Sequence, residues 1–457
     1  MRAIMIPLFL LFIIFAITNS QQPDLVIEVF RHGARAPLNN TYDPDGLWAG
    51  QYGELTGVGQ RMHYILGMAL RKDYPSLLNS YNPSTIYAQS TDVNRTIMSA
   101  YSQLYGIYNG TGPGLPADYN ASLAAPPYAS DSVQTIIDAM DNSYAIPNNF
   151  QPIPVHVTEA KYDTLLLAQG NGCPSSSTYS NKNLQHPNVS IIYQNLSATV
   201  DYLNRNNVSV KSLADLYSVG DTAVCNLQNN FPLPGNMDPK SQVYEDVFFA
   251  MTYYFTLSIQ GQEIQRQMNA YNLFYTIYDH MNGTYNGTSS LKYIFYSAHD
   301  STLTSILSAM GFVSPGCLIE NYYAKLNNQT INEYCLYPIF ASSVKFEFYK
   351  NNGNPYVKIL YNDKVLPICN NVEKCSFSNF YSYIQTITGH LTPNDFASYC
   401  GISQTPAPTG SAKTVAIIFG ILSGILLIAL IALCLTKPKE SLLEDDEVGG
   451  YSLQGKA

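Results

Sequence analysis

Two patterns of apolar and polar positions alternate along the chain and predict its secondary structure. Leu25–Phe30 (LVIEVF) is apolar at all but one position and rich in β-branched residues, which predicts a buried strand. Thr56–Leu70 follows with apolar residues at helical spacing. The same order returns at Ile86–Ala88, which is a short strand candidate. A helix is predicted to follow it, with Thr91 or Asp92 as its cap, and to run to residue 106.

A third strand and helix follow much later in the chain. Tyr293–Ser297 (YIFYS) predicts a strand, and Leu303–Met310 carries apolar residues on one helical face before Gly311 ends the helix. Strands that feed helices favour an α/β fold with at least some parallel pairing. Between about 110 and 240 the chain is richer in Pro, Gly, Asn and Ser. We therefore predict an ectodomain over 21–401, with its core at about 24–130 and 240–401 and an inserted lobe at about 131–239.

Both ends of the chain carry apolar segments that predict its topology. Residues 1–20 hold Arg2 and then an uncharged apolar run, which is typical of a secretory signal peptide. Thr414–Thr436 is 23 residues without a charge, and at about 1.5 Å per residue it is long enough to cross a bilayer core of about 30 Å. Residues 402–413 predict a stalk and residues 437–457 a cytoplasmic tail. Together these segments predict a type I single-pass membrane protein.

Composition and charge exclude several classes of protein. Hydrophobic residues make up 46% of the chain and aromatic residues 12%, which is too apolar for an intrinsically disordered protein. Residues 21–412 hold 19 Lys and Arg against 28 Asp and Glu, a net charge of −9. Because nucleic-acid and anionic-membrane binders need a broad basic face, we expect neither function.

The cysteines and glycosylation sequons agree with a secretory route. Seven cysteines lie outside the predicted span, namely Cys173, Cys225, Cys317, Cys335, Cys369, Cys375 and Cys400. Their spacing lacks a paired zinc pattern, so disulfides are expected, and the odd number leaves at least one thiol free or bonded to another chain. Ten Asn-x-Ser/Thr sequons are present, at Asn39, Asn94, Asn109, Asn120, Asn188, Asn195, Asn207, Asn282, Asn286 and Asn328.

Unusual polar residues follow each of the three predicted strands. Arg31–Pro37 (RHGARAP) comes after the first strand, Thr91–Thr96 (TDVNRT) after the second and Ser297–Asp300 (SAHD) after the third. Ligands in open α/β sheets bind beyond the carboxyl ends of the strands, and helix N-termini favour anions. If the three loops converge, they bring six side chains together: Arg31, His32, Arg35, Arg95, His299 and Asp300.

These six side chains suit the transfer of a phosphoryl group. Three guanidiniums in one pocket would repel one another unless an anion lies between them, and Arg binds phosphate bidentately. His32 can attack phosphorus to form a phosphohistidine, while Asp300 protonates the leaving oxygen and then activates water. Positive neighbours should lower the pKa of His32 below its usual value of about 6.5. A protonated Asp300 predicts an acidic pH optimum, and this chemistry requires no metal ion or cofactor.

The first of these loops carries a resemblance to a known family. Arg31–Pro37 resembles the R-H-G-x-R-x-P signature of the histidine acid phosphatases, a branch of the histidine phosphatase (phosphoglycerate mutase-like) superfamily. Further blocks resemble the family in its own order across roughly residues 24–400, at Leu55–Gly67, Ser90–Ala100, Gln151–His156, Ser297–Leu303 and Ala341–Ser342. With its stalk and span, the whole chain is similar to the lysosomal and prostatic type of this family.

The resemblance implies a fold and a role for each candidate residue. The fold is an α/β phosphoglycerate mutase-like core, whose central mixed sheet is flanked by helices, with a smaller and mainly helical inserted lobe. His32 is then the nucleophile and Asp300 the proton donor. The implied phosphate-binding groups are Arg31, Arg35, Arg95 and His299. A glycan on Asn94 would obstruct Arg95, so we expect Asn94 to stay unmodified.

The resemblance also implies partners, a location and disulfides. The substrate is a small phosphomonoester, a homodimer is possible, and the lysosome or the plasma membrane is the expected site. Two implied bridges are Cys173–Cys400 and Cys369–Cys375. The family's third bridge would join Cys225 to a position that is Ser343 here. Cys317 or Cys335 could replace it, or the two could pair and leave Cys225 free; we slightly favour the Cys317–Cys335 bridge.

Other functions compete with a general acid phosphatase. A phytase or lipid-phosphate phosphatase of the same superfamily is one alternative, although a phytase should carry extra Lys or Arg around its pocket. A catalytically silent receptor or adhesion ectodomain is another, against which the retained His32 and Asp300 argue. A mutase is disfavoured because phosphoglycerates are cytosolic. His63 could also line the pocket, but we favour a structural role for it.

Overall fold

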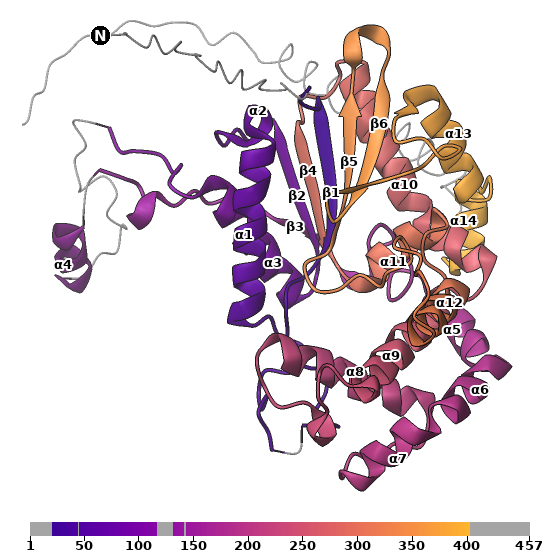
Figure 1. The fold of residues 1–457 in the computed structure, drawn as a ribbon. Coiled ribbons are helices and arrows are strands. Elements are labelled where there is room, and N and C mark those ends of the chain that lie inside the picture. The colour runs from indigo at the N-terminus through magenta and orange to yellow at the C-terminus, as the bar shows by residue number, and fades with distance from the viewer. Residues whose placement is uncertain (1–20, 44, 117–130, 141–142, 403–457) are drawn as a thin grey trace, which may run out of the picture. The chain divides into compact units, whose positions relative to one another are not determined.

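The computed structural model describes residues 21–43, 45–116, 131–140 and 143–402 (Figure 1). The predicted signal peptide 1–20, span 414–436 and tail 437–457 lie outside the described residues, as does the predicted stalk 402–413 beyond its first residue. Among the helices that are described, none is both long and apolar enough to cross a membrane.

A mixed β-sheet forms the core, which confirms the predicted fold class. Its strands follow the order β3-β2-β4-β1-β5-β6-β7, and β8 pairs with β6. β1 and β2 both pair with β4 in parallel, and β3 pairs with β2 in parallel, whereas β5 to β8 add antiparallel strands. The strands are β1 Leu25–Arg31, β2 Ile86–Thr91, β3 His156–Thr158, β4 Tyr293–Ala298, β5 Ser343–Tyr349, β6 Tyr356–Tyr361, β7 Lys364–Leu366 and β8 Cys375–Ser376.

Helices cover both faces of the sheet. Alternate residues of β1 point to opposite faces, and because all of them are buried, both faces need a cover. Val26 and Phe30 pack with side chains of α1 and α3, whereas Ile27 and Val29 pack with those of α10, α11 and α13. The helices on the first face are α1 Gly57–Asp73, α2 Pro75–Leu78 and α3 Asn94–Tyr108. Those on the second are α10 Glu263–Tyr285, α11 Asp300–Ala309 and α13 Phe377–Ile387, and α14 Pro393–Cys400 follows (Figure 1).

A helical lobe with its own apolar core stands beside the sheet (Figure 1). Its helices are α5 Ser176–Leu184, α6 Pro187–Asn195, α7 Ser197–Arg205, α8 Leu213–Gln228 and α9 Gln242–Gln260, while α4 Asp131–Ala139 precedes it and α12 Pro315–Leu326 packs against α9. The predicted lobe boundaries of 131–239 need correction on two points. β3 lies inside that range but pairs with β2 in the sheet, and α9 lies outside it but packs on α8.

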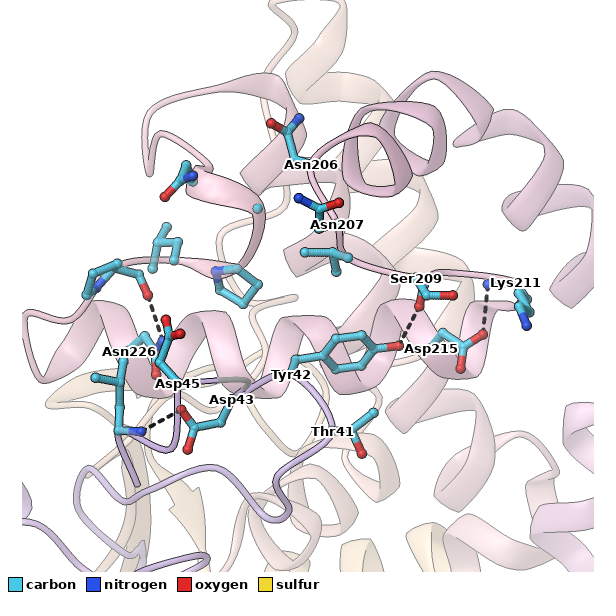
Figure 2. A pocket seen from close by; sticks show the side chains of 17 residues that line it. Thr41, Tyr42, Asp43, Asp45, Asn206, Asn207, Ser209, Lys211, Asp215 and Asn226 are labelled. Carbon is cyan, nitrogen blue, oxygen red and sulfur yellow. Dashed lines mark hydrogen bonds between the residues drawn. The ribbon is translucent and has the colours of Figure 1, made fainter. Parts of the chain in front are cut away.

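A cavity of about 630 Å³ lies where the lobe meets the loop at residues 41–47 (Figure 2). On its wall the hydroxyl of Tyr42 donates a hydrogen bond to the carbonyl of Ser209 (3.0 Å). None of the six predicted site residues lines this cavity.

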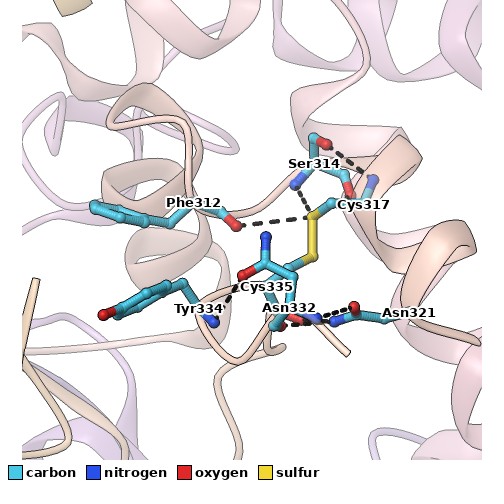
Figure 3. Close-up of a disulfide and its surroundings, with 7 residues drawn as sticks. All are labelled: Phe312, Ser314, Cys317, Asn321, Asn332, Tyr334 and Cys335. Carbon is cyan, nitrogen blue, oxygen red and sulfur yellow. Dashed lines mark hydrogen bonds between the residues drawn. A yellow bond between two sulfur atoms is a disulfide. The ribbon is translucent and has the colours of Figure 1, made fainter. Parts of the chain in front are cut away.

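Three disulfides close within the described chain and confirm the expected pairings. The bridges are Cys173–Cys400, Cys369–Cys375 and Cys317–Cys335, and Cys225 is free and buried in α8. Figure 3 shows the Cys317–Cys335 bridge, which ties the first turn of α12 to the loop that follows the helix. Ser314 caps this helix by accepting a hydrogen bond from the N–H of Cys317 (3.1 Å).

Candidate active site

The three polar loops converge beyond the carboxyl ends of β1, β2 and β4, which share one edge of the sheet because they are parallel. The N–H of His32 donates to the carbonyl of Ala298 at the end of β4 (3.0 Å), and the carbonyl of His32 accepts from Ala341 N–H (3.1 Å). A cleft of about 290 Å³ opens at this edge. Five of the six predicted residues line it, namely His32, Arg35, Arg95, His299 and Asp300, and the sixth, Arg31, contacts Asp300.

Two glycines let the first loop pack tightly against α1. A Cβ atom on Gly33 would lie 2.3 Å from the carbonyl oxygen of Gly59, and one on Gly59 would lie 2.2 Å from that of Ala34. Neither position therefore accepts a side chain without a backbone shift. The N–H of Gly33 also donates to the hydroxyl of Ser99 in α3 (3.1 Å). The loop that carries His32 is thus held by α1 and α3.

The contacts of His32 define which ring nitrogen is free. Nδ1 lies 2.9 Å from the carbonyl oxygen of Gly33, and because a carbonyl only accepts, Nδ1 carries the proton. Nε2 is then the nitrogen with the lone pair. Burial holds the pKa of His32 well below 6.5, and the charges of Arg95 and Arg31 lower it further. The expected direction is confirmed, but burial, which the sequence did not indicate, is the larger cause.

Each of the three arginines has its terminal nitrogens engaged by the protein. Arg31 donates from Nη1 to the carbonyl of Pro338 (2.7 Å) and pairs through Nη2 with Asp300 (2.8 Å). Arg35 pairs through Nη2 with Asp221 (2.6 Å). Arg95 donates from Nη1 to the carbonyl of Gly53 (3.4 Å).

The Nε atoms of these three arginines, unlike their terminal nitrogens, have no hydrogen-bond acceptor among the described residues. All three Nε atoms are buried, and none has an acceptor in the part of the chain that the structure describes. A buried N–H donor without an acceptor is costly, typically by about 1–3 kcal/mol. Two of these donors belong to residues that line the cleft, Arg35 and Arg95, and the third belongs to Arg31, which contacts Asp300 of the same cleft; such a set fits the binding of an anion with several acceptor oxygens, such as phosphate.

Asp300 begins α11 and is surrounded by donors. Its Oδ2 atom lies 2.8 Å from Nη2 of Arg31 and accepts a hydrogen bond from the hydroxyl of Tyr337 (2.7 Å), while Oδ1 accepts from the N–H of Ser301 (2.9 Å). Burial alone would raise the pKa of Asp300, but Arg31, the Tyr337 hydroxyl, Arg35 and His299 together lower it below 3.8. Tyr337 is buried, and the guanidinium of Arg31 lies over its ring, 5.6 Å from the ring centroid.

His299 connects the second and third loops. Its Nδ1 atom lies 3.4 Å from Nη2 of Arg95, which only donates, so Nδ1 accepts and Nε2 carries the proton. Nε2 then donates to the hydroxyl of Thr91 at the end of β2 (2.9 Å). Burial and the charge of Arg95 lower the pKa of His299 to about 3, so this imidazole is neutral. The geometry therefore makes His299 a neutral contact of Arg95.

His63 lies behind the site rather than in it. Its Nε2 atom is 3.1 Å from the carbonyl of Arg31 and its Nδ1 atom is 2.9 Å from Gln103, and the side chain is fully buried. It does not line the cleft. These contacts support the structural role that we favoured for it.

The family model described as "Histidine phosphatase superfamily (branch 2)" matches residues 24–362. The chain belongs to this superfamily. The family resemblance noted in the sequence is therefore confirmed.

Curated relatives are similar to this chain over most of its length. A lysosomal acid phosphatase of Xenopus laevis is 28% identical over 98% of this chain and 95% of its own length. The human prostatic acid phosphatase is 26% identical over 81% of this chain and 86% of its own. Both are named acid phosphatases, which agrees with the predicted enzyme class of phosphoric monoester hydrolases.

Solved structures of this superfamily fold share the architecture at low identity. The phytase of Citrobacter braakii superimposes with a TM-score of 0.55 at 15% identity and covers 84% of this chain and 100% of its own. The phytase of D. castellii has a TM-score of 0.56 at 13% identity and covers 84% and 83%. At this identity the likeness establishes the fold alone.

Two residues of the site had no signal in the sequence. Asp221 in α8 pairs with Arg35, and Tyr337 in the loop before β5 binds Asp300. Neither stands in a motif or beside a predicted strand, so only the tertiary fold shows that they belong to the site.

Proposed function

We propose that this protein is an acid phosphatase that hydrolyses phosphate monoesters through a phosphohistidine on His32. One observation carries the proposal: a neutral imidazole with a free Nε2 lies among three arginines whose buried Nε atoms have no acceptor in the described chain. The relatives named lysosomal and prostatic acid phosphatase support the same reaction. In this proposal Arg31, Arg35, Arg95 and His299 bind the phosphate and Asp300 is the proton donor.

The reaction proceeds in two displacements at phosphorus. First, Nε2 of His32 attacks, a P–N bond forms, and the P–O bond to the leaving group breaks as Asp300 gives its proton to that oxygen. Second, a water molecule attacks the phosphohistidine, the P–N bond breaks, and the Asp300 carboxylate accepts the proton of the water. Neutral alcohol and inorganic phosphate leave, and both side chains return to their first state. The three guanidiniums bind the equatorial oxygens throughout.

The electrostatics favour an acidic optimum. Because the pKa of His32 lies well below 6.5, the nucleophile stays neutral even in acid. Because the pKa of Asp300 is lowered, its protonated form becomes populated only as the pH falls. Since the first step needs a neutral His32 and a protonated Asp300, we expect activity to fall as the pH rises above the acidic range.

The alternatives receive less support from the cleft. Among the described residues that line it, Arg35 and Arg95 are cationic and none is a lysine. A phytase should need further cations for a substrate with many phosphates, so this lining does not favour one. A silent receptor would need neither a buried histidine nor a buried carboxylate in this cleft, and both His32 and Asp300 line it, which supports the enzyme over the receptor.

The location and assembly are proposed on separate grounds. Relatives named lysosomal acid phosphatase support the lysosome. The charge-free segment 414–436 and the apolar segment 1–20 support a type I single-pass anchor with the site on the lumenal or outer side. The possible homodimer stays a prediction from the family resemblance.

The decisive comparison uses the full-length protein and 4-nitrophenyl phosphate at about pH 5. We expect His32→Ala to lower kcat by at least ~10³-fold, because no other group forms the covalent intermediate. His390→Ala, an exposed histidine near the C-terminal end of the described chain, is the matched control and should keep wild-type activity. Equal rates in the wild type and His32→Ala would remove the proposed function.

A further inference from the structure

The carboxylate of Asp221 comes from the helical lobe but binds an arginine of the first loop. Asp221 lies in α8, and its Oδ1 and Oδ2 atoms accept from Nη2 (2.6 Å) and Nη1 (3.3 Å) of Arg35. Oδ2 also accepts from the backbone N–H of Leu38, just past the signature loop (2.9 Å). The pair is nearly buried, with side-chain exposures of 5% for Arg35 and 14% for Asp221.

This contact determines which edge of Arg35 is free. A guanidinium has five N–H donors, and Asp221 engages both terminal nitrogens while the carbonyl of Ala36 takes a second bond from Nη1 (3.0 Å). Among the three nitrogens of this guanidinium, the buried Nε is the one that has no acceptor in the described residues. Asp221 therefore holds the guanidinium by its terminal nitrogens and leaves its Nε without a protein acceptor.

Asp221 also determines the charge of the phosphate site. The site holds the positive charges of Arg31, Arg35 and Arg95, while His32 and His299 are neutral. Burial raises the pKa of the neighbouring Cys225 thiol to about 12, so it adds no charge. With Asp300 and Asp221 ionised, three positive charges face two negative ones, which leaves a net charge of +1.

We propose that Asp221 is a positioning residue that orients Arg35. By leaving the site with a single positive charge, Asp221 also makes the site bind an anion that carries a proton in preference to a fixed dianion. The proposal deepens the proposed function and rests on it. Phosphate and phosphomonoesters in acid carry one negative charge and one proton, which Asp300 shares. Sulfate is a dianion at the same pH and brings no proton, so it should bind less well to the same oxygen-binding groups.

The test compares inorganic phosphate and sulfate as inhibitors of 4-nitrophenyl phosphate hydrolysis by the full-length protein at about pH 5. In the wild type we expect phosphate to inhibit at lower concentration than sulfate. In Asp221→Asn, which removes one negative charge, the ratio of the sulfate Ki to the phosphate Ki should fall about tenfold. Asp221→Glu should keep the wild-type ratio. Asp201→Asn makes the same charge change at an exposed position in α7 and should also keep it.

Each outcome decides for or against the role of Asp221. If both Ki values change by the same factor in Asp221→Asn, their ratio is unchanged. That result would indicate a structural role only and would overturn the proposal. If Asp221→Asn does not fold, the wild type provides the second measurement. Because the pKa of Asp300 is lowered, Asp300 stays ionised above about pH 5, while phosphate loses its second proton as the pH rises and sulfate remains a dianion throughout; phosphate inhibition should therefore weaken more steeply than sulfate inhibition from about pH 5 to pH 8. Parallel pH dependences would overturn the proposal. A wild type without turnover would instead reject the proposed function.

Discussion

Replacing Tyr337 with phenylalanine tests how the protein controls Asp300, the proposed proton donor. The tyrosine hydroxyl donates to Oδ2 of Asp300 at 2.7 Å, and this hydrogen bond stabilises the ionised carboxylate. Phenylalanine keeps the ring beside Arg31 and removes only the donor. Asp300 retains Arg31 at 2.8 Å and the Ser301 N–H at 2.9 Å.

The size of the effect follows from the strength of that bond. A hydrogen bond to a charged group contributes about 1.5–3 kcal/mol, and about 1.4 kcal/mol corresponds to one pH unit. Loss of the bond should therefore raise the pKa of Asp300 by about one unit. This shift corresponds to the lower end of the energy range, because Arg31 and the Ser301 N–H still donate to the carboxylate. A donor with a higher pKa stays protonated to higher pH, so the alkaline limb of the kcat profile should move up by about one unit.

The assay measures kcat against pH with an alkyl phosphate, whose poor leaving group needs the proton. Tyr42→Phe is the matched control, because it removes a hydroxyl that donates to Ser209 in the lobe cavity. Its profile should coincide with that of the wild type. An alkaline limb that stays in place, or moves down, in Tyr337→Phe would refute the assigned control of Asp300.

Three further predictions concern binding and stability. Arg95→Ala should lower kcat/KM by about 10²–10³-fold and raise the phosphate Ki in steady-state assays, since one of three guanidiniums is lost; a change below about threefold would exclude it from the site. Burial raises the pKa of Glu28 above 4.5, so its protonation stabilises the fold in acid and this contribution is lost as pH rises. In urea unfolding, the free energy of unfolding of the wild type should therefore fall relative to that of Glu28→Gln from acid to neutral pH. A constant difference between the two free energies would contradict this. Replacing both Cys317 and Cys335 with serine opens a loop with a sequence separation of 18 and should lower the free energy of unfolding by about 3 kcal/mol in the same assay, whereas no loss would show that the bridge is not stabilising.

Much of the fold and site could be predicted because strand and motif are adjacent in the sequence. Each apolar run ends directly at its polar loop, so parallel pairing of β1, β2 and β4 is enough to bring the loops together. Boundaries that depend on tertiary contacts were predicted less well. The helix expected to start at Thr91 or Asp92 is α3, which begins at Asn94 with Val93 as its N-cap. Thr91 is the last residue of β2, and its hydroxyl binds His299 and Thr96 instead of capping the helix.

Other features could not be predicted because they arise only from packing. β3 has three residues, and Val157 at its centre is 47% exposed, so no apolar run marks it as part of the sheet. Asp221 and Tyr337 reach the site from a lobe helix and a loop without motifs. The sequence also left the partner of Cys225 open, and the structure shows a free thiol in α8.

A single trapping experiment tests the central claim that His32 takes up the phosphoryl group. The full-length protein is mixed with ³²P-labelled aryl phosphate at about pH 5, quenched in alkali within the first turnover and mapped by peptide. We predict an alkali-stable, acid-labile label on the peptide that contains His32, and none in His32→Ala. A label on another residue, or label of equal amount in His32→Ala, would contradict the phosphohistidine mechanism.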